Sequence, residues 1–438
     1  MIKKLFFILL LFTSAQSSFG ICKEDINLEF FNRFNDDCLV YYITQAFNNN
    51  HELKQTSAKV EQYRQQAKYS FGKELPSLSV SPSYLGVHVP RFDNFQLSNN
   101  AFVLPFIANY EADFLLKNRD KTKSALKNYE AVKYEEKAVY LALLSDVASV
   151  YTNILQYDFL LKNQKQDIEI RQILLSANEK KYKRGIIDIN QLNNSKKELE
   201  TSKNKYEELK KEQKTLLMQL AVLCALEPEC TDNMQRGTLN TMEYNLNIPE
   251  EISSDVIFAR PDVMQAEKTL EKAKIDVRIA KKEFFPSFNI TGIWAFNTIA
   301  PGNFFSWESS LAAILAGATQ DIFQGGRKIS NLKIQKSKYE ELFENYCQTN
   351  LNAVKEVNTA LYIAKHDLKI KENTQNKLEY ETSNFENALK KMNNGVISNP
   401  DYLEEKINLI NTENEAANAK TQRIVNYYTL YKAVGGQL

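Results

Sequence analysis

Hydrophobic residues recur at every seventh position along two long stretches that contain neither glycine nor proline. The first stretch runs from Arg119 to Arg184, and the second runs from Arg327 to Asn394. A repeat of this length predicts coiled-coil helices, and at about 1.5 Å per residue each would be near 100 Å long. The first stretch repeats at Tyr140, Val147, Ile154, Leu161, Ile168, Leu175 and Tyr182, with Leu143, Val150 and Tyr157 at companion positions in its upper half. The second repeats at Val354, Val357, Leu361, Ala364 and Leu368, and more loosely at Leu378, Phe385 and Met392.

A glycine ends each of these stretches, and a second run of helix-forming residues follows it. Gly185 precedes the run from Ile189 to Glu227, and Gly395 precedes the run from Asp401 to Val434. Glycine is favoured at the left-handed position just after a helix. The pattern therefore predicts two helical hairpins.

Capping residues support the second helix of each hairpin. Asp188, with Gln191 three residues later, resembles a capping box. Asn399 followed by Pro400 fits an N-cap residue with proline in the first turn. We expect the returning helices to begin at these residues.

Alternating patterns precede each long stretch and predict two pairs of strands. The expected strands lie at about 78–89, 101–113, 286–297 and 309–322, with a polar loop at 90–100. Each has roughly the 9–11 residues that cross a bilayer when tilted. Aromatic residues, which favour membrane interfaces, stand near the predicted strand ends: Tyr84, Trp294, Phe304, Phe305 and Trp307. The alternative is a soluble sheet with an aromatic core.

The strands and hairpins occur twice at nearly one offset. Pro76 and Gly185 are each followed 210 residues later by an equivalent, Pro286 and Gly395. The segment Asp113-Phe114-Leu115 with Arg119 matches Asp321-Ile322-Phe323 with Arg327 at an offset of 208. These matches predict an internal duplication. The expected organisation is a signal peptide at 1–20, an N-terminal segment at 21–38, repeat 1 at 39–227, a linker at 228–257, repeat 2 at 258–434 and a tail at 435–438.

The N-terminus has the three parts of a secretory signal. Lys3 and Lys4 supply the positive end, an apolar stretch follows, and Ser18-Phe19-Gly20 is a small-residue cleavage site, with cleavage after Ala15 as the alternative. Cys22 raises the question of lipidation, although Ile21 before it is bulky for a lipoprotein site. No later stretch looks apolar enough for a spanning helix, so a membrane location would need strands.

An open four-stranded sheet cannot lie in lipid, because its two edges would leave unpaired backbone groups at several kcal/mol each. Closure by two chains gives eight strands, an interior that side chains fill. Closure by three chains gives twelve strands and leaves room for a water-filled pore. The pattern therefore favours a trimer with a hollow cylinder of helices.

Composition excludes several other classes of protein. The net charge of +1 gives no basic excess for nucleic acid. His51, His88 and His366 are scattered without a nucleophile or carboxylate motif, so we expect neither catalysis nor a metal site or cofactor. Export permits a disulfide between Cys224 and Cys230, with buried thiols as the alternative.

Four motifs carry a resemblance to a known family over almost the whole mature chain. They are Ala259-Arg260-Pro261-Asp262-Val263 leading into Phe285-Pro286-Ser287, then Phe323-Gln324-Gly325-Gly326-Arg327, Tyr182-Lys183-Arg184-Gly185 and the counterpart at Gly395. The sequence resembles the TolC-like outer-membrane factors of Gram-negative bacteria. The resemblance implies an α+β membrane protein: a homotrimeric 12-stranded transmembrane β-barrel, four strands per chain, continued by a periplasmic α-helical coiled-coil barrel.

The resemblance also implies a function and partners. The chain would be the outer-membrane exit channel of a tripartite export system, a passive conduit for drugs and small molecules or for type I secreted proteins. Its partners would be a periplasmic adaptor (membrane fusion) protein, an inner-membrane pump of RND, ABC or MFS type, and outer-membrane lipid. Two alternatives are an exported structural or adhesive coiled-coil protein of the cell surface and the periplasmic adaptor of an export pump, although an adaptor would carry one hairpin rather than two.

Site residues follow from the same resemblance. Asp401 and Glu404 lie six and nine residues after the second tip glycine, where family members carry acidic rings that narrow the pore and bind cations; the alternative is that they complement the helix dipole. The tip lock of some members is absent, because Ile397 and Gln191 occupy its positions. The implied adaptor-docking residues are Arg184, Gly185, Ile186, Asn394, Gly395 and Val396.

Overall fold

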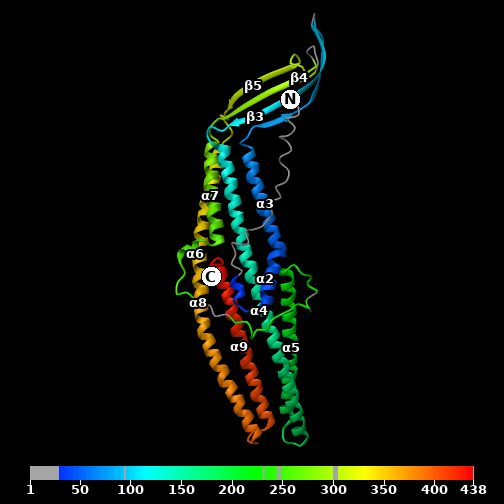
Figure 1. Cartoon of the computed structure of the whole chain (residues 1–438), viewed down its shortest axis with the longest axis vertical. Helices are drawn as coiled ribbons and strands as arrows, with labels where there is room; N and C mark the ends of the chain where they lie inside the picture. The colour runs from blue at the N-terminus through cyan, green and yellow to red at the C-terminus, as the bar shows by residue number, and fades with distance from the viewer. Residues whose placement is uncertain are drawn as a thin grey trace. The chain divides into compact units, whose positions relative to one another are not determined.

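Long helices and one sheet make up the described part of the chain, as a computed structural model of the protein shows (Figure 1). The structure describes residues 29–92, 95–229, 231, 233–243, 248–298 and 304–437. The predicted signal peptide, Cys22 and Cys230 lie outside the described residues. The chain divides into unit 1, formed by Met1–Ser57, Val139–Val256 and Glu356–Leu438, and unit 2, formed by Ala58–Ala138 and Ile257–Lys355.

The described helices and strands follow the duplicated order. The helices are α1 (Glu29–Asn32), α2 (Asp37–Asn49), α3 (His51–Gly72), α4 (Lys117–Lys183), α5 (Ile189–Leu223), α6 (Ser254–Phe258), α7 (Pro261–Lys282), α8 (Arg327–Asn393) and α9 (Asn399–Ala433). The strands are β1 (Ser77–Val80), β2 (Ser83–Phe92), β3 (Phe95–Ala112), β4 (Ser287–Asn297) and β5 (Ser310–Thr319). Both long helices have 67 residues and both returning helices have 35, so the repeats match in length.

The sheet of unit 2 is antiparallel throughout. β3 pairs with β4 and β4 with β5, while β1 and β2 both pair with the other side of β3. β1 and β2 therefore form one interrupted strand, broken around Pro82, against the 18-residue β3. Within the described residues the sheet has four strand positions, and its edges along β5 and along β1 and β2 have no paired strand.

The predicted loop at 90–100 is wrong, because β2 and β3 continue as a hairpin through most of it. Backbone pairing reaches Val89 with Leu97 and Phe92 with Phe95, and the register shifts between them. Pro90 lies at this shift, on a strand whose outer side has no neighbour, which is where a sheet tolerates proline. The polar residues of the segment predicted a loop, but pairing satisfies backbone groups whatever the side chains are.

Register places the predicted alternating residues on two different faces. Phe106 lies opposite Trp294, and Tyr110 lies opposite Ile290, on one apolar face. Ring contacts join that face, with Phe106 and Trp294 centroids 6.1 Å apart. On the other face Thr291 donates a hydrogen bond to Asn109 at 2.9 Å.

In unit 1 the seven-residue repeat of α4 forms the core. Tyr140, Val147 and Ile154 are buried, as are Leu143 and Val150 at the companion positions. This confirms the coiled-coil spacing of the upper half. α4 also contains a stretch long and apolar enough to cross a membrane by length and composition, contrary to the expectation from sequence. Because 67% of that stretch is buried inside the protein, it behaves as a core helix.

A buried carboxylate joins three segments of unit 1. Asp36 caps α2 by accepting hydrogen bonds from the backbone of Cys38 and Leu39 at 2.9 and 3.1 Å. The Tyr151 hydroxyl of α4 donates to Asp36 and accepts from the Gly237 backbone at 2.9 Å. A Cβ on Gly237 would lie 2.3 Å from an Asp36 carboxylate oxygen, so any side chain there would displace that carboxylate. The N-terminal segment and the linker thus meet on one tyrosine.

In unit 2 the start of α4 is held to α7 by another buried acid. Asp120 is 3% exposed and accepts two hydrogen bonds from Arg278, at 2.6 and 2.7 Å, and one from Lys282 at 2.6 Å. Burial raises the pKa of Asp120, but the hydrogen bonds from Arg278 and Lys282 outweigh it and hold the pKa below its usual value. A lowered pKa means that the ionised acid stabilises the fold.

Replacing Asp120→Asn should therefore destabilise the protein near neutral pH, by about 2 kcal/mol, because it removes charge-assisted hydrogen bonds. The stabilisation by Asp120 is present above the unfolded pKa, near 3.9, and is lost as pH falls through the lower folded value. Thermal unfolding at pH 7 and below pH 3 measures this difference. Glu267→Gln is the control and should change little, because it alters only a long contact, 3.7 Å between the charged atoms of Glu267 and Lys268. An equal gap between Asp120→Asn and wild type at both pH values would contradict the account.

Candidate functional site

Each helical hairpin of unit 1 turns at a glycine in the left-handed conformation, and the first turn is at Gly185. Its φ is 72°. The Ile186 backbone N–H donates to the Lys181 carbonyl at 3.0 Å, and the Gly185 N–H donates to Tyr182 at 2.9 Å. These two bonds define a Schellman motif, which closes the carbonyl end of α4.

The second tip repeats this geometry at Gly395, whose φ is 69°. The Val396 backbone N–H donates to the Lys391 carbonyl at 2.8 Å, and the Gly395 N–H donates to Met392 at 2.9 Å. Figure 1 shows α5 returning beside α4 and α9 returning beside α8. Contacts hold each pair: Asn178 donates a hydrogen bond to Ser195 in the first hairpin, and the rings of Phe385 and Tyr402 stack in the second.

The returning helices begin with side-chain caps. Asp188 accepts a hydrogen bond from the Gln191 backbone at 2.8 Å, as the sequence predicted. The expected cap of α9 at Asn399 is wrong, because Ser398 is the N-cap and forms a full capping box with Asp401. Two cap-forming residues stand side by side there, and only Ser398 has an acid three residues later.

All six predicted docking residues lie at these tips and are exposed: Arg184, Gly185, Ile186, Asn394, Gly395 and Val396. In many Schellman motifs the residue after the glycine packs on an apolar residue one turn back. Here the residue one turn back is a lysine at both tips, Lys181 and Lys391. Ile186 and Val396 therefore lack that apolar contact, and they are 65% and 69% exposed. Each tip therefore presents a strongly exposed apolar side chain directly after its glycine.

Asp401 and Glu404 lie in the first turns of α9 and are both exposed. Asp401 accepts hydrogen bonds from the Ser398 hydroxyl at 2.7 Å and from its backbone at 3.1 Å. The Ser398 hydroxyl, its backbone N–H and the charge of Lys181 together lower the pKa of Asp401. Asp401 therefore has a structural role as a capping residue, whereas Glu404 takes no part in the capping box.

Sequence reasoning missed a ladder of polar contacts that joins α4 to α5. Gln164 donates to the Ser202 hydroxyl at 2.7 Å, Arg171 to Glu198 at 3.1 Å, and Asn178 to Ser195 at 2.7 Å. These α4 residues continue the companion positions of the apolar repeat, seven residues apart. The sequence shows that this position changes from apolar to polar at Gln164, but it does not show that the polar side chains have partners.

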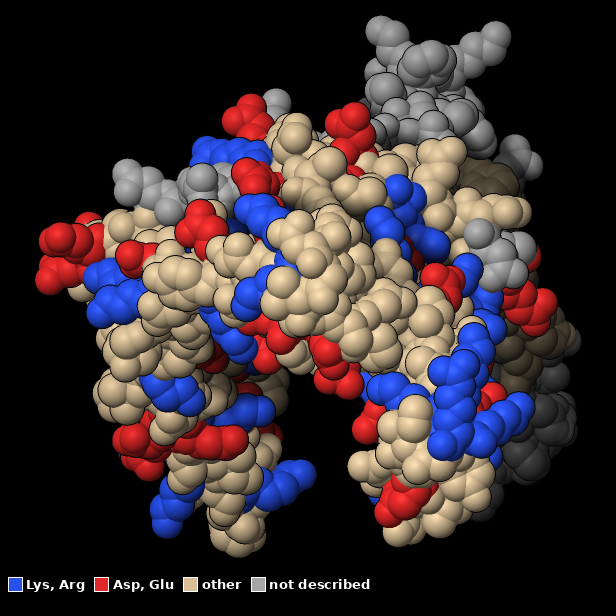
Figure 2. All heavy atoms as spheres, turned by 90° about the horizontal axis from the view of Figure 1, so that it is seen from below, with Lys and Arg blue, Asp and Glu red and all other residues tan. Residues whose placement is uncertain are grey.

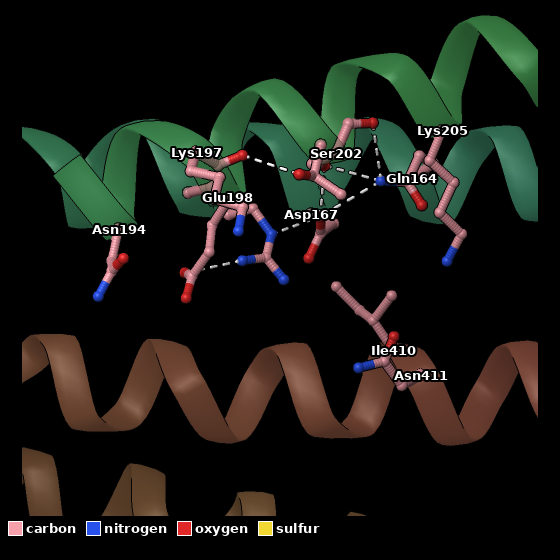
Figure 3. A pocket seen from close by; sticks show the side chains of 11 residues that line it. Gln164, Asp167, Asn194, Lys197, Glu198, Ser202, Lys205, Ile410 and Asn411 are labelled. Atoms are coloured by element: carbon pink, nitrogen blue, oxygen red, sulfur yellow. Dashed lines mark hydrogen bonds and ion pairs between the residues drawn. The ribbon is translucent and has the colours of Figure 1, made fainter.

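A buried acid anchors this ladder beside a cavity of about 410 Å³ lined by α4, α5 and α9 (Figure 3). Asp167 is 6% exposed, accepts from Arg171 at 2.8 Å and accepts from the Ser202 hydroxyl at 2.5 Å. Ile410 of α9 faces the cavity from the opposite wall. The walls carry both signs of charge, and the acid is already satisfied by its neighbours, so the cavity offers no arrangement for catalysis.

Other candidate chemistry is sparse. Among the described residues there is no cluster of histidine, cysteine and acidic side chains that could hold a metal ion. Both signs of charge are mixed on the face that Figure 2 shows. The Cys224 thiol is buried against the Tyr42 carbonyl at 3.5 Å, and burial raises its pKa to about 12. Because Cys230 lies outside the described residues, the Cys224–Cys230 disulfide stays a prediction.

Comparisons with known proteins agree with this architecture. The Campylobacter jejuni CmeC outer membrane channel shares the fold, with a TM-score of 0.85 and 24% identity over 94% of this chain and 88% of its own. The cation efflux system protein CusC of Escherichia coli O157:H7 is 24% identical over 407 residues, or 92% of this chain and 87% of its own. The outer membrane protein OprJ of Pseudomonas aeruginosa is 24% identical over 90% of this chain and 83% of its own.

A family profile matches most of the chain. The profile described as outer membrane efflux protein matches residues 42–225 and 252–436. The two matches begin 210 residues apart, which is the offset of the duplication. The resemblance drawn from the tip and turn motifs is thereby confirmed. The chain belongs to the outer membrane efflux protein family, the TolC-like channels of the Gram-negative outer membrane that carry exported substances out of the cell.

Proposed function

We propose that three copies of this chain form one conduit, with a 12-stranded barrel in the outer membrane and a periplasmic tunnel of helices. The observation that carries this proposal is the open sheet of unit 2, which has four strand positions and two free edges. The strands alternate in direction, so β5 of one copy and β1 and β2 of the next would continue the antiparallel order. Closure by copies of the chain would satisfy every edge.

The two faces of the sheet support a pore. Phe106, Trp294 and Ile314 share the apolar face, which suits lipid. The opposite face is mixed: Asn109 and Thr291 lie on it together with Ile107, Ile293 and Leu315. Its polar residues suit contact with a water-filled interior. Ile314 is 82% exposed in the single chain. Exposure of this apolar side chain to water costs free energy, whereas exposure to lipid does not.

The helices of unit 1 also retain unpaired apolar surface. Within the repeat of α8, Val357 and Ala364 are buried, whereas Leu368 is 43% exposed and the nearby Ile370 is 49% exposed. Coiled-coil residues of this kind are buried when further helices complete the cylinder. A tunnel shared among three chains would bury them.

A charge on the proposed lipid face should prevent assembly. Ile314→Arg should cost about 2–4 kcal/mol per chain if the residue lies near the bilayer midplane. We expect the heat-modifiable trimer to disappear from outer-membrane fractions on gel electrophoresis. Leu315→Arg, on the adjacent residue of β5 that pairs with Thr291 on the other face, is the matched control and should leave the trimer present. Equal loss of trimer in both variants would contradict the assignment of faces.

The conduit would receive its cargo from other proteins. We propose that a periplasmic adaptor and an inner-membrane pump deliver it and that the hairpin tips bind the adaptor. The relatives include a cation efflux system protein and outer membrane proteins of antibiotic and toluene efflux pumps, so drugs, other small molecules and cations are the cargo classes we propose first. Type I secreted proteins are the second class, on the same architecture.

The tip glycines provide a test of adaptor binding. Replacing Gly185 and Gly395 with Trp should abolish export, because open space surrounds both positions and a bulky side chain would protrude from the tip. Trimers should still form, since the tips are far along the chain from the strands. The positive φ adds strain of about 1 kcal/mol for any side chain. Gly185→Ala with Gly395→Ala carries that strain without the bulk, and export should survive it. Normal export by the Trp variant, measured as drug or metal sensitivity of cells, would rule out binding at the tips.

We further propose that Asp401 and Glu404 form acidic rings in the assembled trimer that bind cations. Like charges about 8 Å apart at an effective dielectric of 20 repel by around 2 kcal/mol, which a bound cation relieves. Glu404→Gln should weaken block of single-channel current by divalent cations. Asp401→Asn should do the same, but its loss of an ionised cap should also lower the stability of α9. If divalent cations block the current of Glu404→Gln as strongly as that of wild type, the acidic rings are rejected. Asp401 would then have only its structural role in the capping box.

A further inference from the structure

The duplication gives the chain two tips with one backbone. Gly185 and Gly395 have φ values within a few degrees of each other, and each is followed by an exposed apolar residue. The same pair of backbone hydrogen bonds closes both turns. Any difference in what the tips bind must therefore come from their side chains.

The side chains give the tips opposite charge. Residues 180–195 contain four cations and one acid, whereas the equivalent residues 390–405 contain two cations and three acids. The cations shared by both tips are Lys180 and Lys181 in the first and Lys390 and Lys391 in the second. The differences arise where Lys183, Arg184, Asn194 and Ser195 are replaced by Asn393, Asn394, Glu404 and Glu405.

The helix dipole does not account for the two extra cations. Lysines at the ends of α4 and α8 complement the dipole at both tips. The second tip forms the same turn with asparagines where the first has Lys183 and Arg184, so the turn does not require these charges. Both side chains are exposed, and in the described part of the chain neither forms an ion pair. Asp188, the acid of the first tip, is engaged as the cap of α5.

We propose that the first tip binds an acidic segment of the protein partner and that the second tip binds an uncharged segment of that partner through apolar and amide contacts. This deepens the proposed function and rests on it. Ile186 supplies an apolar centre, and Lys183 and Arg184 supply a charged rim, the usual arrangement of a protein-binding patch. Val396 has a rim of Asn393 and Asn394 instead. The two tips are then unequal sites, and one of them responds to salt.

The test uses the full-length trimer in detergent and, as probe, a purified periplasmic adaptor that supports export with this chain in cells. Adaptor binding is measured at low and high salt. Lys183→Asn with Arg184→Asn gives the first tip the residues of the second. Rim charges act on association and its salt dependence. We expect affinity to fall about tenfold at low salt and the salt dependence to flatten. The turn should survive, because the second tip forms it with asparagines.

A charge-preserving exchange separates position from net charge. The fourfold variant adds Asn393→Lys and Asn394→Arg, which restores the total charge but moves it to the second tip. We expect it to bind as weakly as the twofold variant. Recovery of wild-type affinity would show that net charge alone attracts the partner and would overturn the proposal, as would unchanged binding by the twofold variant. If Trp at both tip glycines also left binding intact, the proposed function itself would fail; loss of binding there would confine the failure to the charge assignment.

Discussion

Backbone groups at the edge of a sheet must find hydrogen-bond partners, and in lipid there is no water to supply them. Four strand positions give this chain two such edges, so the sheet is incomplete within one copy. The apolar face across Phe106, Trp294 and Ile314 also needs an apolar environment, because without a membrane its side chains would contact water. In the proposed trimer, the even number of strand positions would keep neighbouring copies antiparallel where they meet.

Much of this architecture could be predicted because the sequence has two clear hydrophobic periods, one of two residues in the strands and one of seven residues in the long helices. Alternation predicted the faces of β3 and β4, and the seven-residue repeat predicted the buried row at Tyr140, Val147 and Ile154. Glycine at Gly185 and Gly395 located the turns because few other residues adopt positive φ. These signals are local, strong and repeated, so the duplication also confirmed each of them a second time.

The errors arose where a local signal competed with a distant partner. The polar residues at 95–100 have the composition of a loop, yet β2 supplies hydrogen bonds along them. Ser398 and Asn399 are both good caps, and only the side chain of Asp401 decides between them. The polar ladder at Gln164, Arg171 and Asn178 could not be distinguished from a solvated surface, because its partners on α5 come from a helix whose register the sequence does not state.

That ladder makes the first hairpin unequal along its length. In the upper half of α4, separating buried apolar side chains would open cavities, at a cost of several kcal/mol per large residue. Beside Asn178 and Ser195, water can replace each side-chain contact, whose net worth is only about 1 kcal/mol. Fluctuations that separate α5 from α4 should therefore be largest at the turn and become smaller toward the core. A partner that grips the tip would meet the most compliant part of the helix pair while the strands remain undisturbed.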